Sequence, residues 1–224
     1  MINKELKILM EDSSLIAVRK PAGIASESGR IGEADMLSLV RNYLAKKGET
    51  PYAAMIMRLD QPVEGILLFA KNKKSAALLS SMLQKAEIVK TYTALVKNGS
   101  DIEDGEHRLT DYLIRVKGSN ISKVASEKEK NSKDAKKAEL IYKKIGEDSN
   151  GNSLLSVKLL TGRHHQIRLQ LSNAGMPIVG DRKYGGDQGD YRGPLCLACS
   201  RLELLHPKNH EKVLLEISPD FASS

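Results

Sequence analysis

The chain has 224 residues, of which 41% are hydrophobic, enough to bury a core as one larger domain or two small ones. No apolar run approaches the roughly 18 residues of a membrane span, no signal peptide opens the chain, and two cysteines exclude a disulfide framework, so we expect a soluble, cytoplasmic monomer with free thiols. The formal net charge of +7 and the pI near 9.3 favour a polyanionic partner, nucleic acid above all, although net charge alone fits a basic protein without such a partner equally well.

The first half of the sequence alternates short apolar strands with amphipathic helices. Apolar residues at period two, bounded by turn residues such as Pro21 and Gly23, indicate strands. Apolar residues that recur three and four apart indicate helices, and Gly48 is a plausible C-cap for the first of them. We expect strands over 6–12, 15–20, 66–70 and 88–96, and helices over 36–47 and 73–85.

The second half is less regular. Thr161 is predicted as the N-cap of a helix over 161–174, and Gly175 as its end. Strands and helices are mixed without regular βαβ alternation, which predicts an α+β fold. We expect one domain over 1–224, with a central mixed, largely antiparallel sheet flanked by helices. The remaining expected elements are a loop with a short strand over 100–113 and strands over 138–142, 154–160, 195–198 and 202–205.

Much of the positive charge lies in one segment. Residues 117–144 hold nine lysines against four acidic residues. We predict a basic hairpin or mobile loop over 117–137. Contact with RNA and a merely solvated hairpin are equally compatible with this pattern.

Asp60 lies in a turn-rich segment just ahead of the apolar run 66–70. Pro62 fixes φ and Gly65 accepts conformations that other residues avoid, so we expect Asp60 on a loop that enters a buried strand. Loops anchored on rigid strands often carry catalytic groups. By spacing alone, a structural role in which Asp60 caps the turn or pairs with Arg58 is the commoner one.

The segment 161–168, Thr-Gly-Arg-His-His-Gln-Ile-Arg, combines a tight turn with a polar helix start. Exposed N–H groups at such a start bind anions. Arg163, Gln166 and Gln170 recur three and four apart, so they are predicted to share a binding face while the opposite face packs. An ordinary amphipathic helix with a polar outer surface has the same pattern.

Tyr92 is a further candidate, on a predicted strand and on the same face as Lys90 and Ala94. An aromatic ring in that position can stack on a nucleobase. A strand tyrosine is more often part of the core or of the surface, so this signal is weak by itself.

Three other chemistries lose support. Adjacent His164 and His165 point about 100° apart on a helix and have no carboxylate nearby, so we predict no metal there. Cys196 and Cys199 are expected on opposite faces of a strand, which favours buried thiols over a zinc site. The sequence has no phosphate-binding loop, dinucleotide fingerprint or serine-hydrolase elbow.

Taken together, the motifs resemble those of the RluA-type pseudouridine synthases in order and spacing. The three central ones are Arg58-Leu59-Asp60, Lys90-x-Tyr92-x-Ala94 and the 161–168 segment. The opening hairpin with its Lys-Pro-Ala-Gly, the segment 177–185 and the closing His-Pro at 206–207 also resemble this family. Six short patterns in series cover nearly the whole chain, which makes chance agreement hard to obtain.

The resemblance implies the pseudouridine synthase fold and the isomerisation of specific uridines to pseudouridine in structured ribosomal or transfer RNA, without cofactor or metal. Asp60 matches the family's essential aspartate, which acts covalently on the nucleotide or takes the C2′ proton of the sugar. Arg163 matches the arginine that pairs with this aspartate, and Tyr92 matches the residue that packs on the target base. The residues that the resemblance implies in RNA contact are Arg58, Lys90, His165, Gln166 and Arg168.

Three positions depart from the family pattern. Met57 and Ala198 stand where the family has histidine, and His164 replaces a small residue. These positions lie beside the catalytic candidates and bear on the substrate more than on the reaction. We expect no separate N-terminal RNA-binding domain, because the catalytic-type hairpin begins within the first dozen residues.

Two other functions stay open. One is an RNA-binding protein that keeps the fold but has lost catalysis. The other is a phosphoryl transferase, which needs paired carboxylates for Mg²⁺, and Asp60 has only Glu64 close in sequence.

Overall fold

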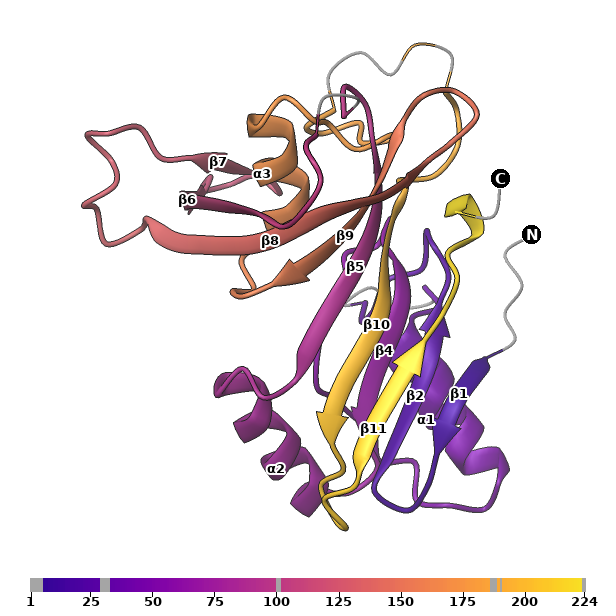
Figure 1. Cartoon of the computed structure of the whole chain (residues 1–224). Coiled ribbons are helices and arrows are strands. Elements are labelled where there is room, and N and C mark those ends of the chain that lie inside the picture. Colours follow the sequence, from indigo (N-terminus) through magenta and orange to yellow (C-terminus); the bar gives the residue numbers. More distant parts are fainter. Residues whose placement is uncertain (1–5, 29–32, 100–101, 186–188, 190, 223–224) are drawn as a thin grey trace. The chain divides into compact units, whose positions relative to one another are not determined.

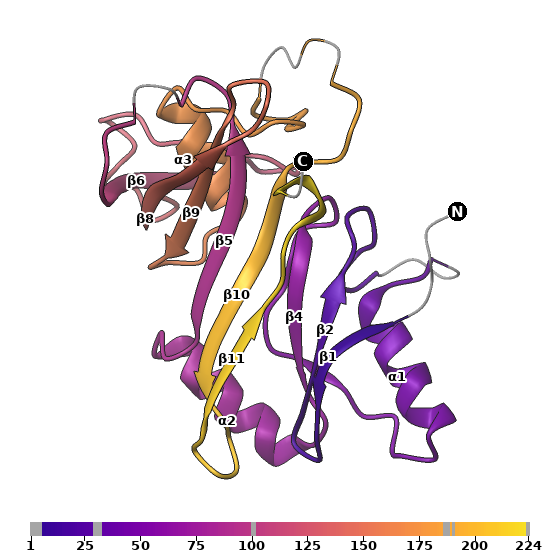
Figure 2. The same cartoon turned by 45° about the vertical axis from the view of Figure 1, so that its right-hand side comes forward.

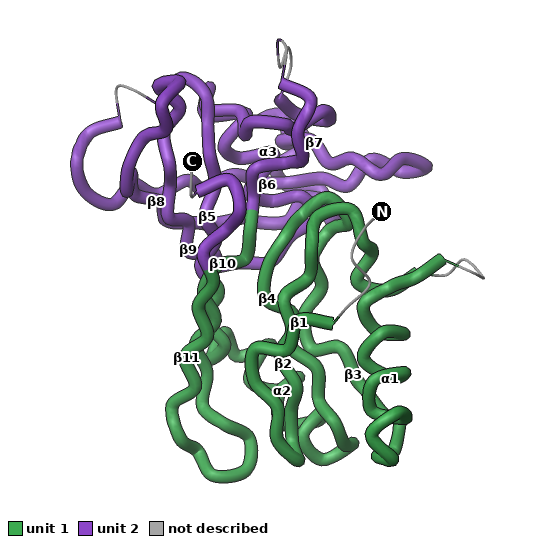
Figure 3. Tube along the Cα trace, turned by 90° about the vertical axis from the view of Figure 1, so that its right-hand side faces the viewer, with its two compact units in different colours: residues 1–90, 198–217 green, residues 91–197, 218–224 purple. Residues whose placement is uncertain are grey.

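The computed structural model describes residues 6–28, 33–99, 102–185, 189 and 191–222 (Figure 1). The expectation about a signal peptide and the start of the predicted loop at residue 100 therefore lie outside the described residues. The chain forms two compact units, residues 1–90 with 198–217 and residues 91–197 with 218–224 (Figure 3). Each unit is described by itself, and the single domain over 1–224 stays a prediction.

Unit 1 contains a mixed sheet and two helices. Its strands follow the order β1-β2-β4-β10, with β11 added to β10 and β3 added to β4. β4 runs parallel to β10 and antiparallel to β2, and β10 and β11 form a long hairpin (Figure 2). The elements are β1 (Lys7–Glu11), β2 (Leu15–Lys20), α1 (Met36–Lys46), β3 (Ala54–Met55), β4 (Glu64–Ala70), α2 (Lys73–Gln84), β10 (Leu197–Leu205) and β11 (Lys212–Glu216).

β4 is the innermost strand of unit 1, and all seven of its residues are buried. Gly65 near its start has φ +136°, and a Cβ at that position would lie 2.4 Å from the backbone nitrogen of Cys199 on β10. Side chains do not tolerate such an approach, so only glycine lets the two parallel strands meet here. The close approach fixes where the strand begins after the Asp60 loop.

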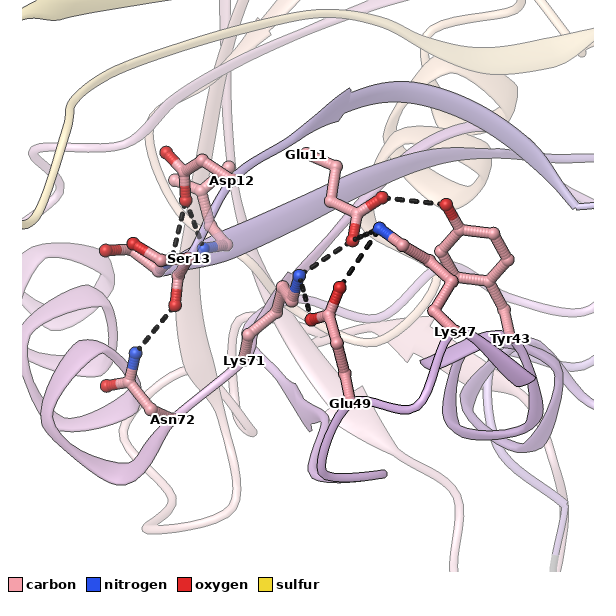
Figure 4. A network of polar contacts seen from close by, with 10 residues as sticks. Glu11, Asp12, Ser13, Tyr43, Lys47, Glu49, Lys71 and Asn72 are labelled. Atoms are coloured by element: carbon pink, nitrogen blue, oxygen red, sulfur yellow. Dashed lines mark hydrogen bonds and ion pairs between the residues drawn. The ribbon is translucent and has the colours of Figure 1, made fainter. Parts of the chain in front are cut away.

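A cluster of ion pairs ties the end of β1 to α1 and to the end of β4 (Figure 4). Glu11 accepts hydrogen bonds from Lys71 at 2.7 Å, from Lys47 at 2.9 Å and from the Tyr43 hydroxyl at 2.9 Å, and Glu49 pairs with both lysines. Burial by itself would raise the pKa of Glu11, but these three hydrogen bonds lower it to about 2. The cluster stays charged at any pH near neutrality.

Unit 2 contains an antiparallel sheet with one α-helix against it. The strand order is β5-β9-β8-β6-β7. α3 contacts β6 and β7, and Leu113, Ala138 and Leu169 form the buried cluster between the helix and the strands. The elements are β5 (Val89–Val96), β6 (His107–Arg115), β7 (Ser122–Val124), β8 (Lys136–Glu147), β9 (Ser153–Leu159), α3 (Gln166–Asn173) and the short 3₁₀-helix η1 (Asp220–Ala222).

The structure confirms the α+β class with a mixed, largely antiparallel sheet, and it confirms most expected elements to within two residues. Two expected strands were too short: β6 has nine residues where a loop with a short strand was expected, and β8 extends well beyond 138–142. Both strands alternate polar and apolar residues and are completed by pairing with each other over seven residues. Among the described residues, no helix has the length and apolar character needed to cross a membrane.

Two expectations about α3 were wrong. Thr161 is not its N-cap, because the helix begins at Gln166 after His165, which adopts the left-handed conformation with φ 55°. The polar face of the helix is not open either, since Gln166 is 3% exposed and Gln170 is fully buried. The side-chain amides of Gln166 and Gln170, which were expected to bind a ligand, instead form hydrogen bonds inside the unit.

Candidate functional site

Asp60 lies on the loop that leads into β4, as expected. The loop turns tightly, since the N–H of Val63 donates to the carbonyl of Asp60 at 3.0 Å. On the preceding side, Ser26 is buried and uses its hydroxyl twice: Oγ donates to the Leu59 carbonyl at 2.7 Å and accepts from the Leu59 N–H at 3.1 Å. These contacts fix the backbone on both sides of Asp60, so its carboxylate starts from a rigid position.

Lys20 holds the same loop through hydrogen bonds to the backbone. Its side chain is fully buried at the end of β2, and Nζ donates to the Gln61 carbonyl at 2.9 Å and to the Pro21 carbonyl at 3.0 Å. Burial lowers the pKa of Lys20 to about 7, against the opposing attraction of Asp60 and Glu64. Lys20 is therefore a charged or readily charged group within electrostatic reach of Asp60.

Lys20 was not among the expected site residues, although it opens the Lys-Pro-Ala-Gly segment. A signal was available: a lysine that ends an otherwise apolar strand directly before Pro21 has little access to solvent. Glu64, the carboxylate nearest to Asp60 in sequence, is engaged elsewhere, because Arg19 forms an ion pair with it. The carboxylate of Glu64 is thus held by β2.

The other candidates in unit 1 differ in exposure. Arg58 is exposed at the start of the Asp60 loop, so its guanidinium is accessible to RNA. Met57, one of the departures from the family pattern, is buried and 5% exposed, as a packing residue would be. Lys90 is partly buried at the beginning of β5, and burial lowers its pKa.

Arg163 lies on an exposed turn between β9 and α3 that is held by neutral groups. The side-chain oxygen of Gln166 accepts from the Arg163 N–H at 2.9 Å and from the Thr161 hydroxyl at 2.8 Å, while its nitrogen donates to the Glu139 carbonyl at 3.0 Å. Arg163 Nε donates to the Lys137 carbonyl at 2.9 Å. The side chain of Gln166 thus holds the turn that precedes α3, while the helix itself has no side-chain cap.

His165, Gln166 and Arg168 were expected to contact RNA, and the structure places all three in the interior of unit 2. Arg168 forms a two-pronged, buried ion pair with Asp181, with both N–O distances at 2.7 Å. Burial, together with the positive charges of Arg168, His164 and Lys183, lowers the pKa of His165 to about 3, so this imidazole is neutral. These placements favour structural roles for the three residues.

Tyr92 lies on β5 opposite Val157 of β9 and is 7% exposed. Its ring is therefore largely packed, with one small part accessible. The candidate catalytic residues are distributed over the chain as follows: Asp60 belongs to unit 1, whereas Tyr92 and Arg163 belong to unit 2. A common cleft for the three residues stays a prediction.

The cysteines and histidines outside the Arg163 turn have structural surroundings. Both cysteines are free and buried, as predicted. Within the residues that the structure describes, no three His, Cys, Asp or Glu side chains are grouped so as to hold a metal ion. His206 instead pairs with Asp12 at 2.7 Å, which closes unit 1 between the first and last hairpins of the chain.

Comparison with known proteins places these features in a family. Residues 14–173 match the family model described as RNA pseudouridylate synthase. The chain is 32% identical to tRNA pseudouridine synthase C of Haemophilus ducreyi, over 94% of this chain and 90% of that protein. It is 31% identical to the dual-specificity RNA pseudouridine synthase RluA of Vibrio parahaemolyticus, over 91% of this chain and 79% of that protein.

A solved structure agrees with the fold. Human RNA Pseudouridylate Synthase Domain Containing 1 matches with a TM-score of 0.78 at 22% identity, covering 97% of this chain and 85% of that chain. At this identity the match shows the fold alone. The matched fold includes the elements that carry the Asp60 loop and the Arg163 turn.

Proposed function

Because the chain belongs to the RNA pseudouridylate synthase family, whose members are isomerases, we propose that it converts specific uridines of ribosomal or transfer RNA to pseudouridine with Asp60 as the essential residue. The observation that carries the proposal is the rigid placement of Asp60, on a loop fixed by Ser26 and Lys20, in a chain with the family's ordered motifs. A carboxylate that must meet one sugar atom gains from such fixed positioning.

The reaction exchanges one bond of the nucleotide for another. The bond between N1 of uracil and C1′ of ribose breaks, the base rotates, and a bond between C5 and C1′ forms, after which the proton on C5 is lost and N1 gains one. Asp60 serves this exchange by one of two routes, as a nucleophile towards the nucleotide or as the base that removes the C2′ proton. Atoms and charge balance without an external oxidant or cofactor.

Arg163 and Tyr92 are assigned supporting roles in this proposal. Among the described contacts, Arg163 uses only Nε of its side chain, so its two terminal nitrogens are available to a carboxylate such as Asp60. Tyr92 packs on the uracil once the base has left its stack. Arg58, exposed on the Asp60 loop, contacts the RNA backbone or braces the space that the base vacates.

The lysine-rich segment is assigned to RNA docking. Most side chains over 117–137 are exposed, and Lys128, Lys133 and Lys136 form no ion pair among the described residues. Free, exposed ammonium groups are the ones that release counterions from phosphates on binding. Cytoplasmic location and a monomeric state remain predictions.

The test of the reaction is a comparison of pseudouridine maps of total RNA from cells with and without the gene. At least one site should disappear in the deletion strain and return when the wild-type gene is supplied. Purified protein should then restore that site in RNA from the deletion strain, in the presence of a chelator. If no site changes and the purified protein binds RNA without modifying it, the chain is the inactive RNA-binding protein instead.

A further inference from the structure

His164 forms a bridge that its neighbours in the motif do not form. Its Nδ1 lies 2.9 Å from Ser122 Oγ, and its Nε2 lies 3.0 Å from Asn120 Oδ1. Asn120 lies in the turn between β6 and β7, and Ser122 is the first residue of β7. They precede His164 by 44 and 42 residues in the sequence. Because the amide oxygen of Asn120 only accepts, Nε2 donates to it, and Nδ1 shares a second hydrogen bond with the Ser122 hydroxyl.

A second set of hydrogen bonds holds the same turn. The N–H of Ser122 donates to the Tyr184 hydroxyl at 2.8 Å, and that hydroxyl lies 2.8 Å from Nδ1 of His165. Lys183 Nζ donates to the Asn120 carbonyl at 2.7 Å. The His164 ring also stacks on His165, with centroids 3.8 Å apart. The β6–β7 turn is therefore joined to the start of α3 through both histidines.

The bridge connects the turn that carries Arg163 with the lysine-rich segment, to which the proposed function gives different roles. His164 follows Arg163 directly in the sequence, so the ring that holds the turn belongs to the same short segment as the candidate catalytic arginine. Asn120 and Ser122 lie within the lysine-rich arm, residues 117–137, which holds seven lysines and three acidic residues. A small residue at position 164 would leave both hydrogen bonds unmade.

We propose that His164 is a positioning residue for substrate RNA: it locks the base of the lysine-rich arm to the turn that carries Arg163. RNA held by the arm then meets this turn in one fixed arrangement, which restricts the uridines that are modified. The inference rests on the proposed function, but the lock itself is a property of the free protein.

The lock is tested first without RNA, by hydrogen exchange of the backbone amides. In His164→Ala, the amides of 119–124 should exchange about fivefold or more faster, as expected for the loss of hydrogen bonds at a partly buried turn. His107→Ala, which removes a histidine from β6 that stacks on Tyr142 instead, should leave 119–124 unchanged. Unchanged exchange of this segment in His164→Ala would overturn the lock.

The consequence for RNA is tested by steady-state kinetics on total RNA from cells that lack the gene. His164→Ala should raise KM roughly fivefold to tenfold with kcat within about twofold of the wild type, since it affects positioning and not the reacting groups. Ser122→Ala should have the same effect, and combining the two should add little more. A fall in kcat with unchanged KM would overturn the proposal.

A conservative variant separates positioning from folding. His164→Gln keeps one donor and one acceptor, so its KM and its amide exchange over 119–124 should lie closer to the wild-type values than those of His164→Ala. If a general folding defect were the cause, the change in KM would instead increase with the loss of thermal stability across all the variants. A uridine-containing oligonucleotide too short to reach the arm should give equal KM values for His164→Ala and wild type. If the wild type modifies no RNA at all, the proposed function fails, while hydrogen exchange still decides whether the lock exists.

Discussion

The Asp60 loop of unit 1 and the Arg163 turn of unit 2 are held in opposite ways. Lys20, a buried amine with a pKa of about 7, donates to the backbone of the Asp60 loop. Gln166, a buried neutral amide, accepts from and donates to the backbone around Arg163. A neutral anchor is insensitive to pH, whereas an amine that titrates near neutrality couples the loop to proton concentration. Each unit can therefore be disturbed separately.

The largest effect on turnover is expected from Asp60→Asn, which changes the proposed reactive group of unit 1. Asparagine keeps the shape but removes the negative charge, so turnover should fall on the order of a thousandfold or more. RNA binding and thermal stability should change little. The matched control is Asp104→Asn, an exposed carboxylate in unit 2, which should keep full activity. Residual turnover near the wild-type rate would exclude Asp60 from the chemistry.

Lys20→Met tests the charged anchor through the pH dependence of stability. Because burial lowers the pKa of Lys20, the unfolded chain binds more protons than the folded chain from about pH 7 up to the normal lysine pKa. The free energy of unfolding of the wild type should therefore rise with pH relative to the variant, by about 2 kcal/mol between pH 7 and 9. Chemical denaturation at the two pH values measures the difference, and parallel pH profiles would contradict the assigned anchor.

Gln166→Ala tests the neutral anchor of unit 2. It removes the acceptor of the Arg163 N–H and the donor to the buried side-chain oxygen of Gln170, which should lower the free energy of unfolding by about 1–3 kcal/mol. In contrast to Lys20→Met, this loss should be the same at the two pH values, because an amide does not titrate. A loss that changes with pH would show that the two anchors are not as distinct as their chemistry implies.

The smallest effect is expected from the surface. Changing Lys133, Lys136 and Lys137 to Gln should reduce the slope of log K against log salt by up to about 0.7 for each lysine that contacts phosphate. Three exposed lysines of unit 1, Lys73, Lys74 and Lys85, provide a control with the same charge change. Equal slopes for the two triple variants would mean that the segment is only a solvated hairpin.

The comparison of the anchors also shows which features the sequence reveals. The strands and the first two helices follow from apolar periodicity, and the position of Asp60 follows from the turn residues before β4. The anchors do not follow, because lysine and glutamine are mostly exposed in proteins and only tertiary packing buries them. The same reason explains Thr161: its hydroxyl meets Gln166 and the Glu139 backbone, contacts between residues that the local pattern does not relate.

The close approach at Gly65 limits how the Asp60 loop could be transferred to another protein. Five residues after Asp60, the chain passes so close to Cys199 of β10 that no Cβ fits at position 65. A graft of the loop onto another protein therefore needs the neighbouring parallel strand and the glycine together. The Asp60 loop can therefore be transferred only together with this pair of strands.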